Sequence, residues 1–473
     1  MDREIKEKIK YLLYPRSVAV IGASRNPRKI GFQVVYNLIK DGYKGRIYPI
    51  NPNADEILGL KCYPNILDAP DDIDLAMIVV PASKVLNVLN EVVRKKVRSV
   101  AIISSGFSEL GKKDLEDAIV NICREHKIPL LGPNIVGIIN TNNNMNLSFC
   151  PHLPFKGKIT FITQSGALAI GLIGWTWASR IGISKLISIG NMAMIGFEEL
   201  IEFLEEDRDT EAVLLYIEGV KNGRLFAEVS KKVSRKKPLI AIKAGKSLRG
   251  AKAAASHTGS LAGNVMLYET AFKYAGIVSA DGLEDGFDKA LALSLQPPLY
   301  GDNLVVVTNG GGAGVLSSDY AEKFGVPLKD LPKDLVNAVK ELIPPFGSPN
   351  NPIDLTGNAY RDDYIRVLDT VFRHPWVDGV VSIYVHAAIT DPVEIADGIA
   401  QVWRNYRDKP ITVCMIGGRE VQVANIWLRD NGIPVYPTPR RAISAMAALR
   451  QYGLFLERER GNGGMVRNKE ISS

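Results

Sequence analysis

Short apolar runs that end in small residues or proline recur along this chain and alternate with helical patterns. Between residues 17 and 134 the runs are SVAVIGAS, GRIYPINP, LAMIVVP, SVAIISSG and IPLLGPN. Continuous Val/Ile/Leu runs separated by amphipathic helices are typical of parallel strands that are buried on both faces and joined by right-handed crossovers. The pattern predicts a doubly wound α/β sheet whose ligand lies at the carboxyl ends of the strands.

The same pattern restarts twice. ITFITQSG, SKLISIGN, EAVLLYIEG and PLIAIKAG predict a second α/β domain, and LVVVTNGGGAG, DGVVSIYV and PITVCMIGG predict a third one after the proline-containing linker LQPPLYGDN. We expect an α/β protein of three doubly wound domains, at residues 10–140, 155–295 and 303–457. Residues 458–473 are expected to form a polar tail of a composition typical of disorder.

Charge and cysteine content exclude several classes of protein. The net charge of +7 is mild for 473 residues, and the run KKVSRKKP favours a solvated helix face over a nucleic-acid patch. The cysteines lie far apart without a C-x-x-C pair, which favours neither a zinc site nor a disulfide framework. The sequence lacks a signal peptide's apolar region and any run of about 18 apolar residues. We expect a cytoplasmic protein with reduced thiols, no metal site, and no membrane or nucleic-acid partner.

The first domain has the beginning of a nucleotide site. VAVIGASRNPRKIG predicts a strand, a turn of small residues and a helix, whose backbone N–H groups and dipole can bind a phosphate. Gly22 is not followed by the G-x-G-x-x-G spacing, and Asn51 stands where a dinucleotide site places an acidic residue on the ribose. These departures disfavour NAD, while a Rossmann-like fold without a nucleotide stays open as an alternative.

A single histidine stands out in the second domain. His257 lies among small residues in KAAASHTGSLAG, where the Ser and Thr hydroxyls can donate hydrogen bonds to an anion. An imidazole can act as a nucleophile and carry a phosphoryl group when a carboxylate holds its other ring nitrogen. Glu218, a lone acid after the apolar run AVLLYI, is the candidate for that carboxylate, although a strand-end surface charge is the alternative. A histidine is more often a surface or core residue than a catalyst, so an ordinary surface or core position is the alternative for His257.

Two strand-to-helix turns are candidate anion sites. In TQSGALAIG, Ser165 is a candidate N-cap and Gly166 begins the helix, so free N–H groups face an incoming anion, although an ordinary capped helix would look the same. A second position lies in VVVTNGGGAG, which lacks the G-K-[ST] of a P-loop; its candidate residues are Asn309, Gly310, Gly311 and Gly312.

The order of these motifs carries a family resemblance. IGAS, INP, VVPA, SSGF and GPN resemble the CoA-binding domain of succinyl-CoA synthetase α subunits, and TQSGALA, SIGN, YIEG and SHTGS resemble the phosphohistidine domain of nucleoside-diphosphate-forming acyl-CoA synthetases. The third domain, with NPIDLTGNA at 351–359, resembles the ligase domain of that superfamily. From about residue 10 to 455 the chain resembles α subunits of ADP-forming acetyl-CoA (acyl-CoA) synthetases.

The resemblance implies roles for individual residues. His257 matches the phosphorylated histidine, Glu218 the glutamate that holds it, and Ser165 and Gly166 the helix start that binds its phosphate, with the turn at 309–312 as the second phosphate position. Ile135 replaces a cysteine that is common in the family. The implied CoA site comprises Gly22, Ala23, Ser24, Lys29, Asn51, Pro52, Pro81, Ser105, Gly106 and Asn134, with Ser105 and Gly106 at the pantetheine end.

The resemblance also implies an activity. Acyl-CoA, by family preference acetyl-CoA, and inorganic phosphate would give CoA and an acyl phosphate, and His257 would relay the phosphoryl group to ADP. Mg²⁺ and ADP/ATP would bind a β subunit of ATP-grasp type in an α2β2 assembly, because this chain has no ATP-grasp segment. The enzyme would then be an acid–thiol ligase that makes ATP by substrate-level phosphorylation. A non-catalytic CoA-sensing regulatory subunit and an NAD-dependent oxidoreductase are the alternatives.

Overall fold

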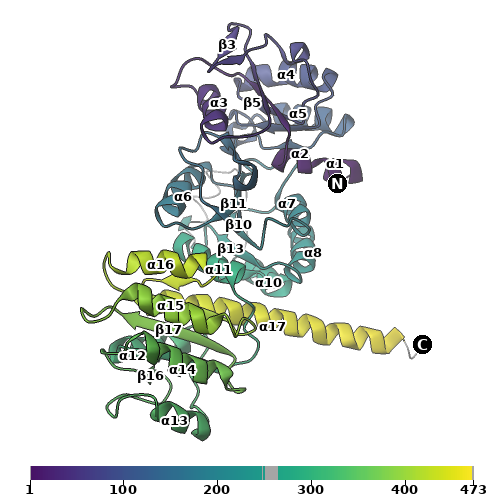
Figure 1. Cartoon of the computed structure of the whole chain (residues 1–473). Helices are drawn as coiled ribbons and strands as arrows, with labels where there is room; N and C mark the ends of the chain where they lie inside the picture. The colour runs from purple at the N-terminus through teal and green to yellow at the C-terminus, as the bar shows by residue number, and fades with distance from the viewer. Residues whose placement is uncertain (1, 248, 251–264, 471–473) are drawn as a thin grey trace. The chain divides into compact units, whose positions relative to one another are not determined.

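The chain folds into two compact units, residues 1–275 and 276–473. The computed structural model describes residues 2–247, 249–250 and 265–470. In the described part of the chain the first unit contains two large sheets and a small two-stranded one, and the second unit contains one large sheet; each large sheet has helices on both faces (Figure 1). This arrangement confirms the predicted α/β class with doubly wound sheets.

The first sheet has five parallel strands in the order β2-β1-β5-β6-β7. Its strands are β1 (Ser17–Ile21), β2 (Arg46–Ile50), β5 (Leu75–Ile78), β6 (Ser99–Ile102) and β7 (Leu130–Leu131). Every residue of β1, β5 and β6 is buried, as expected for strands covered on both faces. Helix α3 (Ile30–Lys40) covers one face, and α4 (Ala82–Arg94) and α5 (Lys113–Glu125) cover the other (Figure 1). Smaller elements are α1 (Arg3–Lys8), α2 (Lys10–Leu13), β3 (Glu56–Ile57), β4 (Leu60–Lys61), η1 (Ile66–Asp68) and η2 (Ser108–Leu110).

The second sheet places β13, β12, β10, β11, β8 and β9 side by side in that order within the first unit. The parallel strands are β10 (Lys156–Thr163), β11 (Ile183–Ser188), β12 (Ala212–Ile217) and β13 (Leu239–Lys243). Two antiparallel strands extend its edge, β8 (Gly137–Asn140) and β9 (Met145–Ser148), joined by η3 (Thr141–Asn143). The helices are α6 (Gly166–Ala178), α7 (Phe197–Leu204), α8 (Gly223–Ser234) and α10 (Val265–Ala275). Strand β8 therefore belongs to this sheet, although its residues fall in the range expected for the first domain.

The second unit is built on parallel strands in the order β16-β15-β17-β18-β19. They are β15 (Leu304–Thr308), β16 (Ile353–Asp354), β17 (Gly379–Val385), β18 (Ile411–Ile416) and β19 (Val435–Tyr436), with β14 (Val278–Ala280) ahead of them. The helices are α11 (Leu283–Leu295), α12 (Gly311–Lys323), α13 (Lys333–Lys340), α14 (Arg361–Arg373), α15 (Pro392–Trp403), α16 (Val421–Asp430) and α17 (Pro439–Glu470). Helix α17 continues through residues 458–470, where a polar tail is expected, and its last turns extend past the sheet (Figure 1).

All three sheets repeat one strand order. In each, the second strand of the parallel series lies beside the first, and the third lies on the first strand's other side. In such sheets the crevice at the carboxyl end of the first and third strands binds ligands, because the crossovers leave it in opposite directions. The three turns that follow β1, β10 and β15 are therefore the expected ligand positions.

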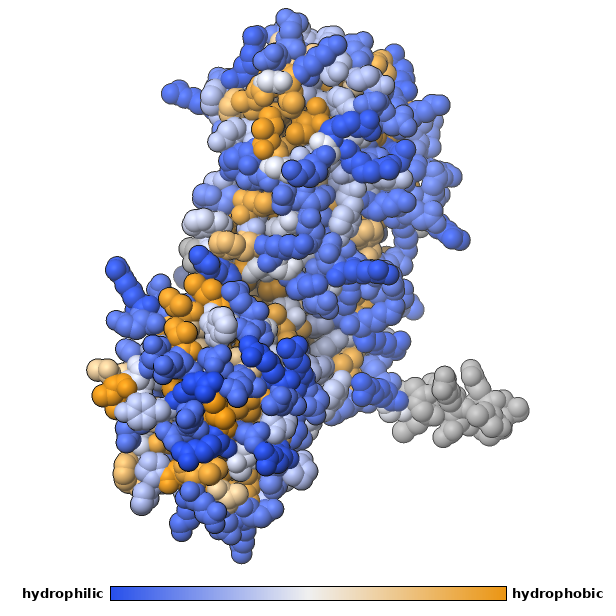
Figure 2. Space-filling view, in the orientation of Figure 1, coloured by the Kyte–Doolittle hydropathy of each residue, from blue (hydrophilic) through white to orange (hydrophobic). Residues whose placement is uncertain are grey.

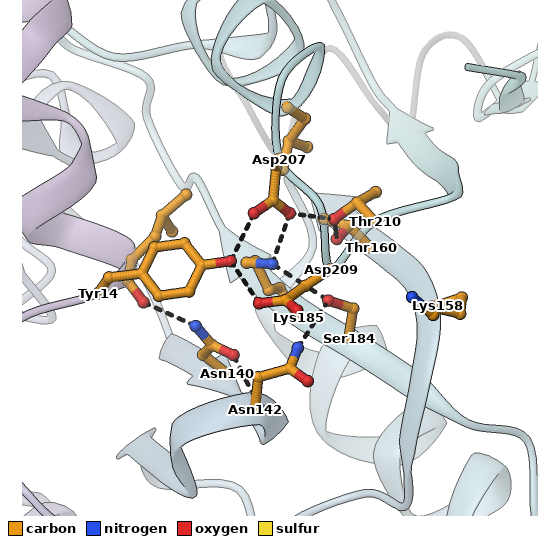
Figure 3. Close-up of polar contacts among 12 residues, drawn as sticks. Tyr14, Asn140, Asn142, Lys158, Thr160, Ser184, Lys185, Asp207, Asp209 and Thr210 are labelled. Atoms are coloured by element: carbon orange, nitrogen blue, oxygen red, sulfur yellow. Dashed lines mark hydrogen bonds and ion pairs between the residues drawn. The ribbon is translucent and has the colours of Figure 1, made fainter. Parts of the chain in front are cut away.

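A buried polar network fixes the amino-terminal half of β11 (Figure 3). The Lys185 side chain has no exposed surface, and its Nζ lies 2.6 Å from Asp207 Oδ2. The Tyr14 hydroxyl, which follows α2, donates to Asp207 and, at 2.8 Å, to Asp209. Burial lowers the pKa of Lys185 against the opposing effect of Asp207. This network joins the amino-terminal helices of the first domain to the second sheet.

The surface is mostly hydrophilic on the face shown in Figure 2. An apolar patch on this face lies over α3, where Ile30, Tyr36 and Ile39 are each 41% exposed. Among the helices of the described part of the chain, none has both the length and the apolar composition needed to cross a bilayer.

Candidate active site

The turns of the first sheet bring most of the predicted CoA-site residues to one edge. Its strands are parallel, so the residues that follow each strand lie on the same edge. The residues placed there are Gly22 to Ser24 after β1, Asn51 and Pro52 after β2, Pro81 after β5, Ser105 and Gly106 after β6, and Asn134 after β7. The edge is the expected position for a nucleotide ligand.

Gly22 is required by its backbone and its neighbours. Its φ is +96°, and a Cβ atom there would lie 2.9 Å from the Val79 carbonyl oxygen. The neighbouring turn is held by Asn51, whose Nδ2 donates to the Ala23 carbonyl at 2.7 Å. The amide of Asn51 therefore ties two strand ends together, a role that the sequence did not indicate.

Exposed cations surround the beginning of α3. Lys29 occupies the N-cap position and is exposed, as are Arg25 and Arg28. The hydroxyl of Ser24 accepts the Asn26 N–H at 3.0 Å and shapes the turn between them. A helix start with nearby cations is suited to phosphate groups.

The turn after β10 closes on itself and begins α6. Thr163 Oγ1 accepts the Ser165 N–H at 3.0 Å, and Ser165 Oγ accepts the Leu168 N–H at 3.4 Å. Ser165 is thus the N-cap that its position in TQSG predicts. The N–H groups of Gly166 and Ala167 in the first turn of α6 have no acceptor within the helix, which leaves them for an anion.

Gln164 joins this turn to Glu218. Its Oε1 accepts the backbone N–H groups of Glu218 at 2.6 Å and Gly219 at 3.0 Å. Lys243 Nζ donates to the Glu218 carbonyl at 2.9 Å, and burial lowers the pKa of Lys243 while the charge of Glu218 opposes that shift. The backbone of Glu218 is therefore held beside the turn that begins α6.

The second unit repeats this geometry after β15. Thr308 Oγ1 accepts the Gly310 N–H at 3.0 Å, as Thr163 does for Ser165. Asn309 takes the place of Gln164, and its Oδ1 accepts the Val385 N–H at 2.7 Å at the end of β17. Helix α12 then begins at Gly311, so the turn at 309–312 has the same free N–H groups as the start of α6.

Within the first unit, the turn after β11 contacts the turn after β7. Gly190 has a φ of +51°, and a Cβ atom there would lie 2.3 Å from the Pro133 carbonyl oxygen. The Asn191 N–H donates to that same carbonyl at 3.0 Å. The motifs SIGN and GPN therefore meet, and Asn134, the last residue of GPN, has a φ of +64° and donates from Nδ2 to Asn191 Oδ1 at 3.3 Å. Ile135 beside it is buried, at 3% exposed.

His257 lies outside the described residues, which stop at 250 and resume at 265. Its predicted partners Glu218, Ser165 and Gly166 are brought together in the first unit, and the turn at 309–312 belongs to the second unit. In the described ranges no group of three or more His, Cys, Asp or Glu side chains could hold a metal ion. The sequence did not indicate the contacts of Gln164 or Asn191, although Gln164 lies in the motif TQSGALA and Asn191 in the motif SIGN.

Three domain-family models match the chain. They describe a CoA binding domain at residues 16–141, a succinyl-CoA ligase like flavodoxin domain at 156–293 and a ligase-CoA domain at 304–453. The α subunit of an ADP-forming acetate–CoA ligase I from Pyrococcus furiosus is 46% identical over 93% of this chain and 97% of that subunit. The chain belongs to the ADP-forming acetate–CoA ligase family. The membership confirms the resemblance drawn from the motifs.

Relatives within the ADP-forming acetate–CoA ligase family differ in length. A Methanocaldococcus jannaschii ADP-forming acetate–CoA ligase is 42% identical over 96% of this chain, which spans only 64% of that protein. Among solved structures, dinucleotide forming acetyl-coenzyme A synthetase 1 of Ca. Korarchaeum cryptofilum, in complex with phosphate and ADP, is 43% identical with a TM-score of 0.91. The match covers 95% of this chain and 98% of that one.

Proposed function

We propose that this chain is the α subunit of an ADP-forming acyl-CoA synthetase and that it turns acyl-CoA and phosphate into CoA and an acyl phosphate. A phosphate oxygen attacks the thioester carbonyl, the C–S bond breaks and CoA leaves as the thiolate. A ring nitrogen of His257 then attacks phosphorus, and the carboxylate of the free acid leaves. Transfer from phospho-His257 to ADP gives ATP.

The observation that carries the proposal is the position of the Glu218 backbone beside the turn that begins α6. A carboxylate there can accept the N–H of one His257 ring nitrogen and leave the other nitrogen unprotonated for attack on phosphorus. The hydrogen bonds from Glu218 and Gly219 to Gln164 support this position. The free N–H groups of α6 would stabilise the phosphate dianion, and the turn at 309–312 is proposed as a second phosphate position, since each helix start has a partial charge of about +0.5.

The CoA site is proposed at the edge of the first sheet. The match to a CoA binding domain at residues 16–141 supports it, as do the exposed cations at the start of α3. In this proposal Ser24, Lys29 and Asn51 face the nucleotide and its phosphates, and Ser105 and Gly106 face the pantetheine.

The nucleotide site is proposed on a partner. The relatives named as α subunits are matched over 97% of their length, whereas longer relatives with the ligase name are matched over 64%. The name of α subunit that the shorter relatives carry supports a separate β subunit, which we propose to be of ATP-grasp type, to form an α2β2 assembly and to hold Mg²⁺ and ADP. We propose acetate as the acid, because the relatives with 46% and 42% identity are both named for acetate.

The test is ATP formation by the chain purified with its β subunit. We expect ATP from acetyl-CoA, ADP and phosphate, with one CoA released for each ATP, and none when either subunit is left out. Binding of CoA without any turnover would contradict the proposal and favour a regulatory CoA-sensing subunit. Calorimetry tests the remaining alternative, an NAD-dependent oxidoreductase, since we expect the chain to bind CoA and not NAD.

A further inference from the structure

The side chain of Asn191 joins the turn after β11 to the turn after β6. Its Nδ2 lies 2.6 Å from Glu109 Oε2 and 2.8 Å from Glu116 Oε2, and it donates to both carboxylates. Ser108 Oγ also lies near this nitrogen, at 3.2 Å. An amide NH₂ group has two hydrogens, so this single nitrogen supplies the donors for two neighbouring carboxylates.

Glu109 in turn holds the Gly106–Phe107 turn. The backbone N–H groups of Gly106 and Phe107 both donate to its carboxylate, that of Phe107 at 3.2 Å to each oxygen. Burial raises the pKa of Glu109, but the hydrogen bonds from Asn191 and from the Gly106 N–H outweigh it, so the pKa lies below its ordinary value. The turn is therefore fixed by a charged side chain that Asn191 stabilises.

Glu116 connects the same amide to α5. This carboxylate is only 7% exposed and also accepts the Ser108 hydroxyl at 2.7 Å. A buried carboxylate is costly unless donors surround it. Without the neutral donor of Asn191, Glu109 and Glu116 would face each other as like charges.

Asn191 is also connected to the candidate phosphate turn through the pairing of two strands. Strand β11 pairs with β10 in a register that places Ser188 opposite Thr163, and the Ile189 N–H donates to the Thr163 carbonyl at 2.9 Å. The Asn191 N–H donates to Pro133 in the first domain. Backbone hydrogen bonds thus fix Asn191 relative to both turns.

We infer that Asn191 is a positioning residue for the CoA thioester. Through Glu109, its amide holds the turn at the pantetheine end in register with the phosphate-binding start of α6, so that the thioester carbonyl meets the attacking phosphate. The inference rests on the proposed function, because it takes the Gly106 turn as the pantetheine end of the CoA site.

The test compares four variants of the complete α–β enzyme. Asn191→Asp keeps the shape of the side chain but replaces the donor nitrogen by an oxygen of a third carboxylate. Glu109→Gln removes one charge. The double variant Asn191→Asp/Glu109→Gln restores an amide–carboxylate pair with donor and acceptor exchanged. Asn222→Asp is the matched control, because Asn222 is an exposed N-cap of α8 where a carboxylate oxygen serves equally well.

We expect Asn191→Asp to lower kcat/KM for acetyl-CoA roughly tenfold or more, as expected when hydrogen bonds to charged groups are lost. The lower kcat/KM should result from a higher KM for acetyl-CoA, whereas KM for ADP should stay within about twofold of the wild type. The double variant should recover a large part of the loss, and Asn222→Asp should match the wild type.

Two results would overturn the inference. One is an Asn191→Asp enzyme with unchanged KM for acetyl-CoA, and the other is a double variant no better than the worse single one. If Asn191→Asp does not fold, Glu109→Gln and the double variant still decide the question. A wild-type complex without acetyl-CoA-dependent ATP formation would instead contradict the proposed function, so the two failures are distinguishable.

Discussion

Gln164 Oε1 lies 2.6 Å from the backbone nitrogen of Glu218 and accepts its hydrogen bond. A side chain in the turn that begins α6 therefore sets the position of the first residue after β12. Asn309 and Val385 have the same relationship in the second unit, at 2.7 Å. The two turns share this construction, with a glutamine amide in the first unit and an asparagine amide in the second.

Removing the bridge should displace Glu218. In Gln164→Leu the N–H groups of Glu218 and Gly219 lose their acceptor, which should lower the free energy of unfolding by about 1–3 kcal/mol. The rate of ATP formation should fall by more than the fraction of unfolded enzyme explains. Gln164→Glu keeps an acceptor oxygen and should therefore lose less activity and less stability. Urea unfolding and turnover of the same preparations check this. A Gln164→Leu enzyme with normal turnover would show that Glu218 needs no such support.

The contact between SIGN and GPN requires a glycine. A Cβ atom at Gly190 would lie 2.3 Å from one backbone oxygen and 2.4 Å from the next, those of Pro133 and Asn134. Gly190→Ala should therefore destabilise the chain by about 1–3 kcal/mol or more, because backbone must move. Gly171→Ala is the matched control in α6, where a Cβ meets nothing within 4 Å and should stabilise by about 0.5–1 kcal/mol. Thermal unfolding of both variants measures the difference, and equal melting temperatures would contradict it.

The buried ion pair of Lys185 and Asp207 should contribute far more to the free energy of unfolding than a surface ion pair of the same sheet. Lys185→Met leaves Asp207 buried without its cation and should cost about 3–5 kcal/mol of unfolding free energy. Lys158→Met removes a pair with Glu211 whose side chains are 50% and 53% exposed, and should cost less than about 1 kcal/mol. Denaturant titration tests the contrast. Similar costs for both would mean that the network does not anchor β11.

The same network predicts a pH dependence. Burial raises the pKa of Asp207, but hydrogen bonds from Lys185, Thr210 and Tyr14 outweigh it, so the folded pKa lies below the ordinary 3.8. As the pH falls, Asp207 is therefore protonated in the unfolded chain before it is protonated in the folded chain. The stabilisation that the Asp207 carboxylate gives to the fold is complete above pH 3.8 and is lost below it. The stability difference between the wild type and Asp207→Asn should shrink as the pH is lowered from 5 to 3. A constant difference over that range would contradict the assignment.

Much of the fold follows from local patterns in the sequence. The strands that precede the turns of Gly22, Asn51, Ser165 and Asn309 could be predicted because apolar runs and the small residues after them are local signals. Within each sheet, parallel strands then place their carboxyl ends on the same edge, whatever the details of packing. This explains why the candidate CoA residues gather at one edge of the first sheet.

What the sequence did not indicate depends on contacts between distant segments. The antiparallel strand β8 joins the second sheet because its partner is β11, a choice that no local pattern encodes. The sequence around Lys185 does not predict its contacts with Asp207 or Tyr14, and the sequence around Asn191 does not predict its hydrogen bond to Glu109. Each of these pairings is set by tertiary register rather than by spacing along the chain.

The most direct test is phosphoryl labelling of His257. The α–β complex is incubated with acetyl-CoA and radioactive phosphate, and the label is mapped by mass spectrometry of peptides handled at alkaline pH. We predict acid-labile label on the peptide with His257, absent in His257→Ala, formed more slowly in Glu218→Gln, and discharged by ADP. Acetyl-CoA-dependent labelling that persists in His257→Ala, or that resides on another residue, would contradict the proposal.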